Sequence, residues 1–188
     1  DDISIAQIAL TDTPQPVPAV PSGETSTSST ASDWRLVLRL GAADLKRLDA
    51  VPLILGAIEQ FEGVRPFAGR LFLVLSELFN NALDHGLLRL PSSLKAGAEG
   101  MDVFLDERTR RLSRLSAGAV EFELTLRQSP SESPVLHIGC ADTGPGFDHE
   151  EQLQSAFEEP TGEDMLKGHG RGIPLLLRVC EDVRYSGA

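Results

Sequence analysis

Two polar residues of the segment 76–86, which reads SELFNNALDHG, have types and spacing that suit chemistry. Glu77 and Asn81 are four residues apart, so on a helix they would lie one turn apart, on the flank of the apolar stripe. A carboxylate can accept a proton from a hydroxyl group or a water, and an amide oxygen can bind a hard cation such as Mg²⁺. Taken alone, the pair is better explained as the ordinary surface of an amphipathic helix.

A second segment, 142–147, reads DTGPGF and follows the apolar run 135–141. An acidic residue at the end of a buried strand needs a hydrogen-bond donor, and the exocyclic amine of adenine is a fitting one for Asp142. Gly144 and Gly146 would let a ligand approach the backbone closely. The same residues also make a good turn.

A third segment, 168–173, reads GHGRGI and leads into a predicted helix. Glycines before a helix expose backbone N–H groups near the positive end of the helix dipole, which is a common way to hold phosphates. A single glycine loop is also explained by a hinge or a helix start. The three segments in this order are far more specific than any one of them.

Hydrophobic periodicity predicts the elements that carry these segments. The most secure is a helix over residues 66–88, and an alternating strand is expected at 34–40. A helical region is predicted over 43–61, with Asp49 as a cap and Pro52 in its first turn. The other expected elements are a charged helix at 101–115, a hairpin of strands 120–126 and 135–141, and a helix at 173–183 entered at Pro174. This mixture favours a two-layer α/β sandwich.

Composition limits the classes of function. A chain of 188 residues with 41% apolar residues can bury one compact core, and the net charge of -11 argues against nucleic-acid binding. No apolar run is long enough to span a bilayer and the start shows no signal pattern, so a cytoplasmic protein without a membrane partner is expected. Cys140 and Cys180 are interpreted as core residues. His85, His137 and His149 are interpreted as structural or exposed.

The first 32 residues differ from the rest of the chain. Residues 11–32 are almost all Pro, Ser, Thr, Gly, Ala, Asp or Glu, which predicts a disordered linker because such a segment buries little apolar area. Residues 1–10 have the alternating pattern of a strand, and the pattern is present from the first residues. We therefore expect the chain to be a fragment of a longer protein.

Together the three segments resemble the N box, G1 box and G2 box of the GHKL ATPase superfamily. The resemblance covers residues 33–188 and implies the Bergerat ATP-binding fold, a mixed, mostly antiparallel sheet packed on helices, with ATP and Mg²⁺ as cofactors. It implies that Glu77 is the catalytic base, Asn81 the magnesium ligand and Asp142 the residue that reads adenine. Residues 157–167 would form a short lid over the nucleotide. The remaining cofactor contacts implied by the resemblance are Asp84, Gly144, Gly146, Lys167, Gly168, His169, Gly170, Arg171 and Gly172.

Within the superfamily the compact size and short lid are most similar to the anti-sigma-factor serine kinases. These phosphorylate an anti-anti-sigma protein of the STAS fold, so the resemblance implies signal transduction by partner switching. Other implied partners are a sigma or anti-sigma factor and a second copy of the chain. Residues 1–10 resemble the closing strand of a type 2C phosphatase, which precedes such a kinase in some response regulators of two-component systems. Residues 1–10 are therefore interpreted as the remnant of a preceding phosphatase domain.

Two alternatives use the same pocket. In the first, ATP orders the lid so that the domain sequesters a sigma factor or STAS protein, without physiological turnover. In the second, the chain is the catalytic domain of a sensor histidine kinase. The second needs an upstream helical pair with an acceptor histidine, and residues 1–60 contain no histidine.

Overall fold

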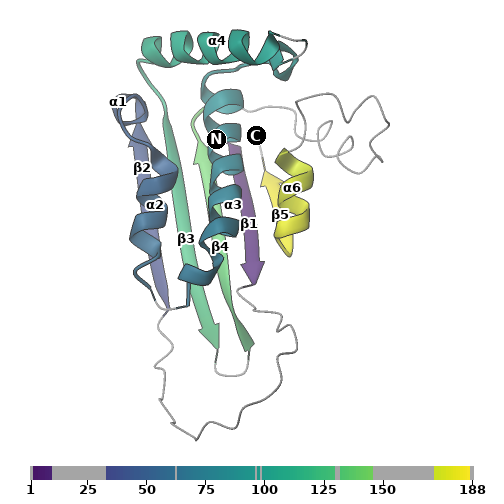
Figure 1. The fold of residues 1–188 in the computed structure, drawn as a ribbon. Coiled ribbons are helices and arrows are strands. Elements are labelled where there is room, and N and C mark those ends of the chain that lie inside the picture. Colours follow the sequence, from purple (N-terminus) through teal and green to yellow (C-terminus); the bar gives the residue numbers. More distant parts are fainter. Residues whose placement is uncertain are drawn as a thin grey trace, which may run out of the picture.

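The computed structural model of the chain describes residues 2–9, 33–61, 63–95, 97, 99–129, 132–145 and 172–186. In this part of the chain, helices pack against one face of a single sheet (Figure 1). The five strands of the sheet are β1 (Asp2–Ala9), β2 (Trp34–Gly41), β3 (Ala119–Ser129), β4 (Glu132–Asp142) and β5 (Asp182–Ser186), in the order β2-β3-β4-β1-β5. All described pairings are antiparallel. The α/β class and the two layers are thus as predicted.

The centre of the sheet is the predicted hairpin. β3 and β4 pair from Val120 opposite Asp142 to Leu126 opposite Leu136. Side chains alternate along a strand, so every second residue faces the helices. On that face Val120, Phe122, Leu124, Leu126, Leu136, Ile138 and Cys140 are buried and form the floor of the core. The opposite face carries cross-strand ion pairs, such as that of Arg35 on β2 with Glu123 on β3.

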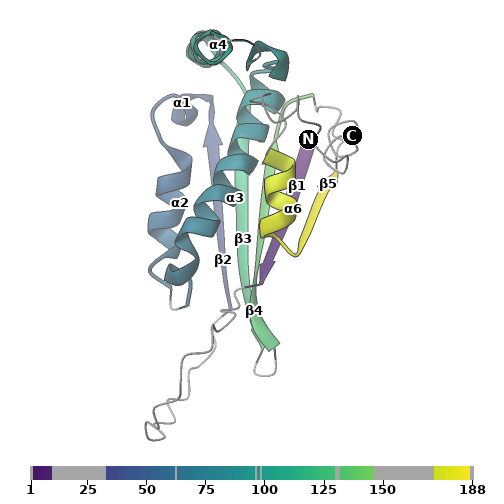
Figure 2. The ribbon, with the colours of Figure 1, turned by 45° about the vertical axis from the view of Figure 1, so that its right-hand side comes forward.

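The helical layer consists mainly of α2 (Ala50–Ile58), α3 (Ala68–Asn80) and α6 (Gly172–Val179), with α4 (Gly100–Arg114) lying across the end of α3 (Figures 1 and 2). The short helices are α1 (Ala42–Leu45), η1 (Arg65–Phe67) and η3 (Ser92–Lys95). The region 43–61, predicted as helical, is two helices separated by residues 46–49. Asp49 does stand at the N-cap position of α2, but its side chain makes no cap hydrogen bond.

The long helix forms as predicted, as α3 continued by η2, and its apolar face is buried. Leu71, Val74, Leu75 and Leu78 form its buried stripe. From Asn81 the helix continues as a π-helix, η2 (Asn81–Leu87), a wider winding that is frequent at functional sites. Both cysteines are buried, in agreement with the core role predicted for them. Burial raises the pKa of the Cys180 thiol to about 11, so it stays protonated near neutral pH.

The last predicted helix, 173–183, is too long. α6 ends at Val179, and residues 182–186 form β5 instead. β5 pairs with β1, Val183 opposite Ala6 and Tyr185 opposite Ser4. Valine and tyrosine favour strands, and the neighbouring strand supplies the backbone partners that a strand requires.

The strand predicted within residues 1–10 forms as β1, and Asp2–Ala9 is an inner strand of this sheet, between β4 and β5. The interpretation of residues 1–10 as the remnant of a preceding phosphatase domain stays a prediction. β1 pairs with β4 from Asp2 opposite Asp142 to Ala9 opposite Val135. This pairing satisfies the backbone groups of β4 on the side away from β3. The predicted linker, 11–32, lies outside the described residues.

None of the helices described above is both long and apolar enough to cross a lipid bilayer.

Candidate functional site

The end of the long helix and the end of β4 meet at two glycines. A Cβ atom on Gly86 would lie 2.5 Å from the carboxylate of Asp142, closer than real Cβ contacts come. A Cβ atom on Gly144 would collide with the carbonyl oxygen of Gly86. Only glycine allows this approach, because it has no Cβ atom. The first two of the three predicted segments therefore come together in space.

Asp142 is held firmly at this junction. Its side chain is buried, with the residue 3% exposed, and Oδ1 accepts a hydrogen bond of 2.7 Å from the Gly144 amide. The next residue, Thr143, continues the pairing to β3: its amide donates to the carbonyl of Ala119, and its Oγ1 accepts from the Ala119 amide. A buried carboxylate is stable only when hydrogen bonds compensate its desolvation. The carboxylate of Asp142 therefore acts as a hydrogen-bond acceptor at this junction.

Glu77 lies on α3, half-buried. Burial raises the pKa of its carboxyl group above the ordinary value of 4.5, and the charge of Lys95 partly opposes this by lowering it. A carboxylate with a raised pKa is a better proton acceptor than an exposed one, because its charged form is less stabilised by water. The electrostatics of Glu77 therefore suit the role of a base.

Asn81, one turn after Glu77, has an amide nitrogen that is buried and has no hydrogen-bond partner among the described residues. A buried polar group without a partner is costly, and a ligand or water can provide one. The amide oxygen of the same side chain is a donor atom that suits Mg²⁺, which keeps several waters and substrate phosphates as its other ligands. Within the described parts of the chain no three acidic, histidine or cysteine residues cluster as a metal cage. A single amide ligand is compatible with Mg²⁺ held largely by phosphates.

Asp84, predicted as a cofactor contact, forms an ion pair inside the protein. Its carboxylate is 2.6 Å from Nε of Arg108 on α4, and the residue is 4% exposed. Arg111 of the same helix donates to the carbonyl oxygens of Leu88 and Arg89. The charged helix is thereby fixed to the end of the long helix. A contact between Asp84 and a cofactor stays a prediction.

His85 has a structural role, in line with its interpretation from sequence. It is half-buried, and its Nδ1 is 2.8 Å from the carbonyl oxygen of Leu90, to which it donates when that nitrogen carries the proton. Burial lowers the pKa of His85, while the bond to Leu90 and the charge of Asp84 raise it. The ring therefore fixes the chain where it leaves η2.

Lys95, at the end of η3, was not singled out by the sequence. Its charge lowers the pKa of both Glu77 and His85. Its Nζ is 4.2 Å from the centroid of the Phe104 ring. No motif marks this lysine, since its place depends on how the loop between η2 and α4 folds.

Most of the third segment lies outside the described residues, namely the predicted contacts Gly168, His169, Gly170 and Arg171. The predicted contacts Gly146 and Lys167, the predicted lid at 157–167 and His149 also lie outside them. Gly172 is the first residue of α6, which packs beside α3. The helix that the glycine loop enters is thus next to the helix that carries Glu77 and Asn81.

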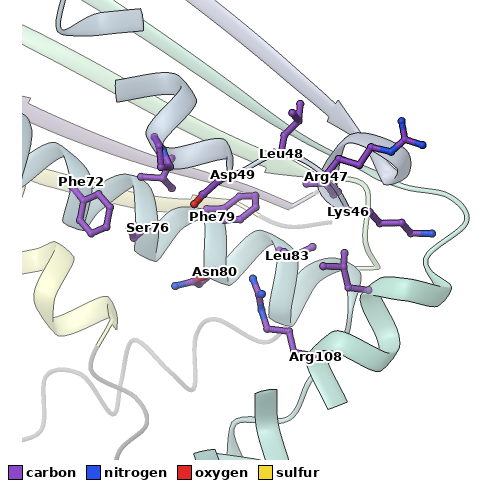
Figure 3. A pocket seen from close by; sticks show the side chains of 14 residues that line it. Lys46, Arg47, Leu48, Asp49, Phe72, Ser76, Phe79, Asn80, Leu83 and Arg108 are labelled. Atoms are coloured by element: carbon purple, nitrogen blue, oxygen red, sulfur yellow. The ribbon is translucent and has the colours of Figure 1, made fainter. Parts of the chain in front are cut away.

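A separate groove of about 470 Å³ runs along the other flank of α3 (Figure 3). It lies between the α1–α2 connection, α3 and α4, and contains Phe72, Ser76, Phe79, Asn80 and Arg108 among its lining residues. Glu77, Asn81 and Asp142 do not line it. The groove is therefore distinct from the group of residues around Asp142.

Comparison of the chain with protein-family models, with curated proteins and with solved structures finds no match.

Proposed function

We propose that this chain binds Mg·ATP in a Bergerat-type pocket and transfers the γ-phosphate to a serine of a STAS-fold anti-anti-sigma protein. The observation that carries the proposal is the contact between Gly86 and Asp142. It joins the helix that bears a candidate base and a candidate magnesium ligand to the buried aspartate at the end of β4. This arrangement is the one that the resemblance of the three sequence segments implies.

Each residue of the group would have a separate task. Asp142 would accept a hydrogen bond from the exocyclic amine of adenine, since it is a buried acceptor at a strand end. The amide nitrogen of Asn81 would donate to the phosphates or their waters, which supplies its missing partner. Its oxygen would hold Mg²⁺, which neutralises phosphate charge when bound. The N-terminus of α6 would provide further N–H donors.

In the transfer itself, Glu77 would take the proton of the serine hydroxyl. The serine oxygen bonds to the γ-phosphorus while the bond from that phosphorus to the β–γ bridging oxygen breaks, so ADP leaves with the electron pair. Positioning of the reactants and neutralisation of charge supply most of the rate enhancement in such reactions. A general base typically contributes about 10²–10⁴-fold.

Binding is tested first, by calorimetric titration of the full chain with Mg·ATP. We expect the wild type to bind and Asp142→Asn to bind about 10–100-fold more weakly, because the amide presents a weaker acceptor to adenine. Asp102→Asn, an exposed position on α4, is the matched control and should bind like the wild type. If the wild type and Asp142→Asn bind Mg·ATP with equal affinity, Asp142 does not belong to the nucleotide site.

Transfer is tested with labelled ATP and a STAS-fold anti-anti-sigma protein. Glu77→Gln should keep Mg·ATP affinity within about threefold and lose at least about 10²-fold in the rate of phosphoserine formation. The wild-type rate should rise with pH until the pH exceeds the raised pKa of Glu77, because the base acts as the carboxylate. If a complex with the STAS protein forms only in the presence of nucleotide and no phosphoserine appears, the result would instead indicate the alternative function, in which the domain sequesters its partner without turnover.

A further inference from the structure

The helix α4 leaves three large apolar side chains exposed. It lies across the end of α3, at the edge of the molecule in both views (Figures 1 and 2). Met101, Val103 and Leu105, all in its first half, are 49%, 49% and 50% exposed, whereas Phe104 between them is buried. Apolar side chains that gather on a surface in this way are typical of a site that another protein covers.

Two of these three residues belong to a stripe that continues into the groove along α3. At 3.6 residues per turn, four residues of α4 lie within about 60° of one another: Met101, Leu105, Arg108 and Leu112. Arg108 and Leu112, in the second half of the helix, line the groove. Val103 lies about 160–200° away from Met101 and Leu105, on the opposite face of the helix. The stripe therefore has an exposed first half and a second half that forms a wall of the groove.

The charges along this helix change sign between its two halves. Residues 99–107 contain four acids and no base, and residues 108–114 contain four arginines and no acid. Two such helices attract each other when they lie antiparallel, because each acidic half then meets a basic half, and they repel each other when they lie parallel. The charge pattern of α4 is thus complementary to that of a second, antiparallel α4.

The groove itself is basic and apolar, although the chain has a net charge of -11. The charged residues among those that line it are three bases and one acid: Lys46, Arg47, Arg108 and Asp49. Leu48 and Phe72 also line it and are 45% and 47% exposed (Figure 3). Within the described residues, several charges of both signs make no ion pair: Asp102 and Asp106 in the first half of α4, and Lys46, Arg47 and Arg114 in or near the groove. These charges are available to a partner.

We propose that two copies of the chain pair through antiparallel α4 helices, so that the first half of each α4 lies in the groove of the other copy. A two-fold axis would relate the two contacts, as in most homodimers. Met101 and Leu105 of one copy would then cover Phe72 and Leu112 of the other. α4 lies between the first two of the three segments that carry the resemblance, so the inference depends neither on that resemblance nor on nucleotide binding.

Sedimentation velocity of the full chain, at about 10 µM to 1 mM, tests the pairing over the range of micromolar to millimolar dissociation constants. We expect the wild type to dimerise in this range. Met101→Glu and Leu105→Glu should each weaken the dimer at least about tenfold, because a carboxylate would be buried against an apolar wall. Val103→Glu is the matched control, since Val103 is equally exposed but lies on the opposite face, and it should dimerise like the wild type.

The groove is tested in the same way with two neighbouring residues of α3. Phe72→Ser should weaken the dimer at least about tenfold. Leu73→Ser should not weaken it, because Leu73 is 42% exposed but does not line the groove. An equimolar mixture of Leu105→Glu and Phe72→Ser should form a heterodimer that is tighter than either variant alone. In that heterodimer one of the two contacts joins an unaltered α4 to an unaltered groove.

Three outcomes would overturn the inference. A wild type that stays monomeric at about 1 mM has no such interface. A dimer that Leu105→Glu leaves intact, or that Val103→Glu weakens equally, uses another surface. A mixture without a tighter heterodimer shows that α4 and the groove do not meet. Circular dichroism and melting temperatures close to those of the wild type show that each variant is folded, and Mg·ATP titration of the same variants reports separately on the proposed function.

Discussion

Gly86 permits the contact that brings the long helix to the strand-end aspartate. Gly86→Ala would place a methyl group 2.5 Å from the Asp142 carboxylate, so the carboxylate or the helix must move. We expect the free energy of unfolding to fall by about 1–3 kcal/mol, as for an overpacked core, and Mg·ATP affinity to fall with it. Urea denaturation and calorimetric titration measure the two effects.

Gly56 on α2 provides the matched control for this substitution, since nothing lies within 4 Å of a Cβ atom placed there. Gly56→Ala should leave nucleotide affinity unchanged and stabilise the helix by up to about 1 kcal/mol, because alanine has the higher helix propensity. If both variants behave alike, the close approach at Gly86 has no consequence for the site.

At the level of single residues, the sequence could predict only positions that a local pattern marks. Glu77 and Asn81 are marked by their helical spacing, and Asp142 by its place after an apolar strand. The contact of Lys95 with Phe104 could not be predicted in this way, because it depends on the turn of the chain at Gly100. The partner of Asp84 was equally hidden, since Arg108 is 24 residues away in sequence.

α4 is attached to the rest of the molecule by the buried Phe104 and by two arginines, Arg108 and Arg111. Arg108→Ala would leave the carboxylate of Asp84 buried without its cation, and removing one partner of such a pair costs about 3–5 kcal/mol. We expect a loss of about 3 kcal/mol in the free energy of unfolding, measured by urea denaturation. Adding Asp84→Asn to Arg108→Ala should recover part of this loss, because the uncompensated charge is then gone.

Arg110, on the same helix, is the control for Arg108. It pairs with Glu107 on the exposed side of α4, where ion pairs are screened by water. Arg110→Ala should therefore cost less than about 1 kcal/mol. Similar losses for Arg108→Ala and Arg110→Ala would mean that the Asp84 pair does not anchor the helix.

Elements with a strong and uninterrupted period were the ones that sequence could predict. The long helix and the hairpin have such periods, and the charged helix at 101–115 is α4, Gly100–Arg114. The boundaries at 46–49 and after Val179 were missed. At the first, residues 46–49 contain no glycine or proline that would mark the break, and at the second, the strand forms because β1 is available as a neighbour. Local periodicity therefore marks neither boundary.

On the scale of the whole molecule, β1 joins β5 to the other strands of the sheet. Among the described strands β5 pairs with β1 alone, and β1 also covers the free edge of β4. Ala6 pairs with Ile138 on one side and Val183 on the other. Ala6→Pro removes a backbone donor and fixes φ, which an inner strand does not tolerate.

We therefore expect Ala6→Pro to speed amide hydrogen exchange about tenfold in peptides from both β4 and β5, as followed by mass spectrometry. Ala6→Ser keeps the backbone donor and should leave exchange in these strands nearly unchanged. Faster exchange confined to β1 itself would show that β5 is held by other contacts. The order of strands could not be predicted from sequence, because pairing of residue 2 with residue 142 leaves no local trace.

The antiparallel pairing of β1 with β5 places Ile3 opposite Ser186, so the start and the end of the described part of the chain lie side by side (Figures 1 and 2). A circular permutant could therefore join residue 186 to residue 2 through a short connector and open the chain between residues 10 and 32. All described strand pairings would be kept. The new termini would follow Ala9 and precede Trp34, at the end of the sheet away from Asp142, where an affinity tag or fluorophore would leave the candidate pocket unobstructed.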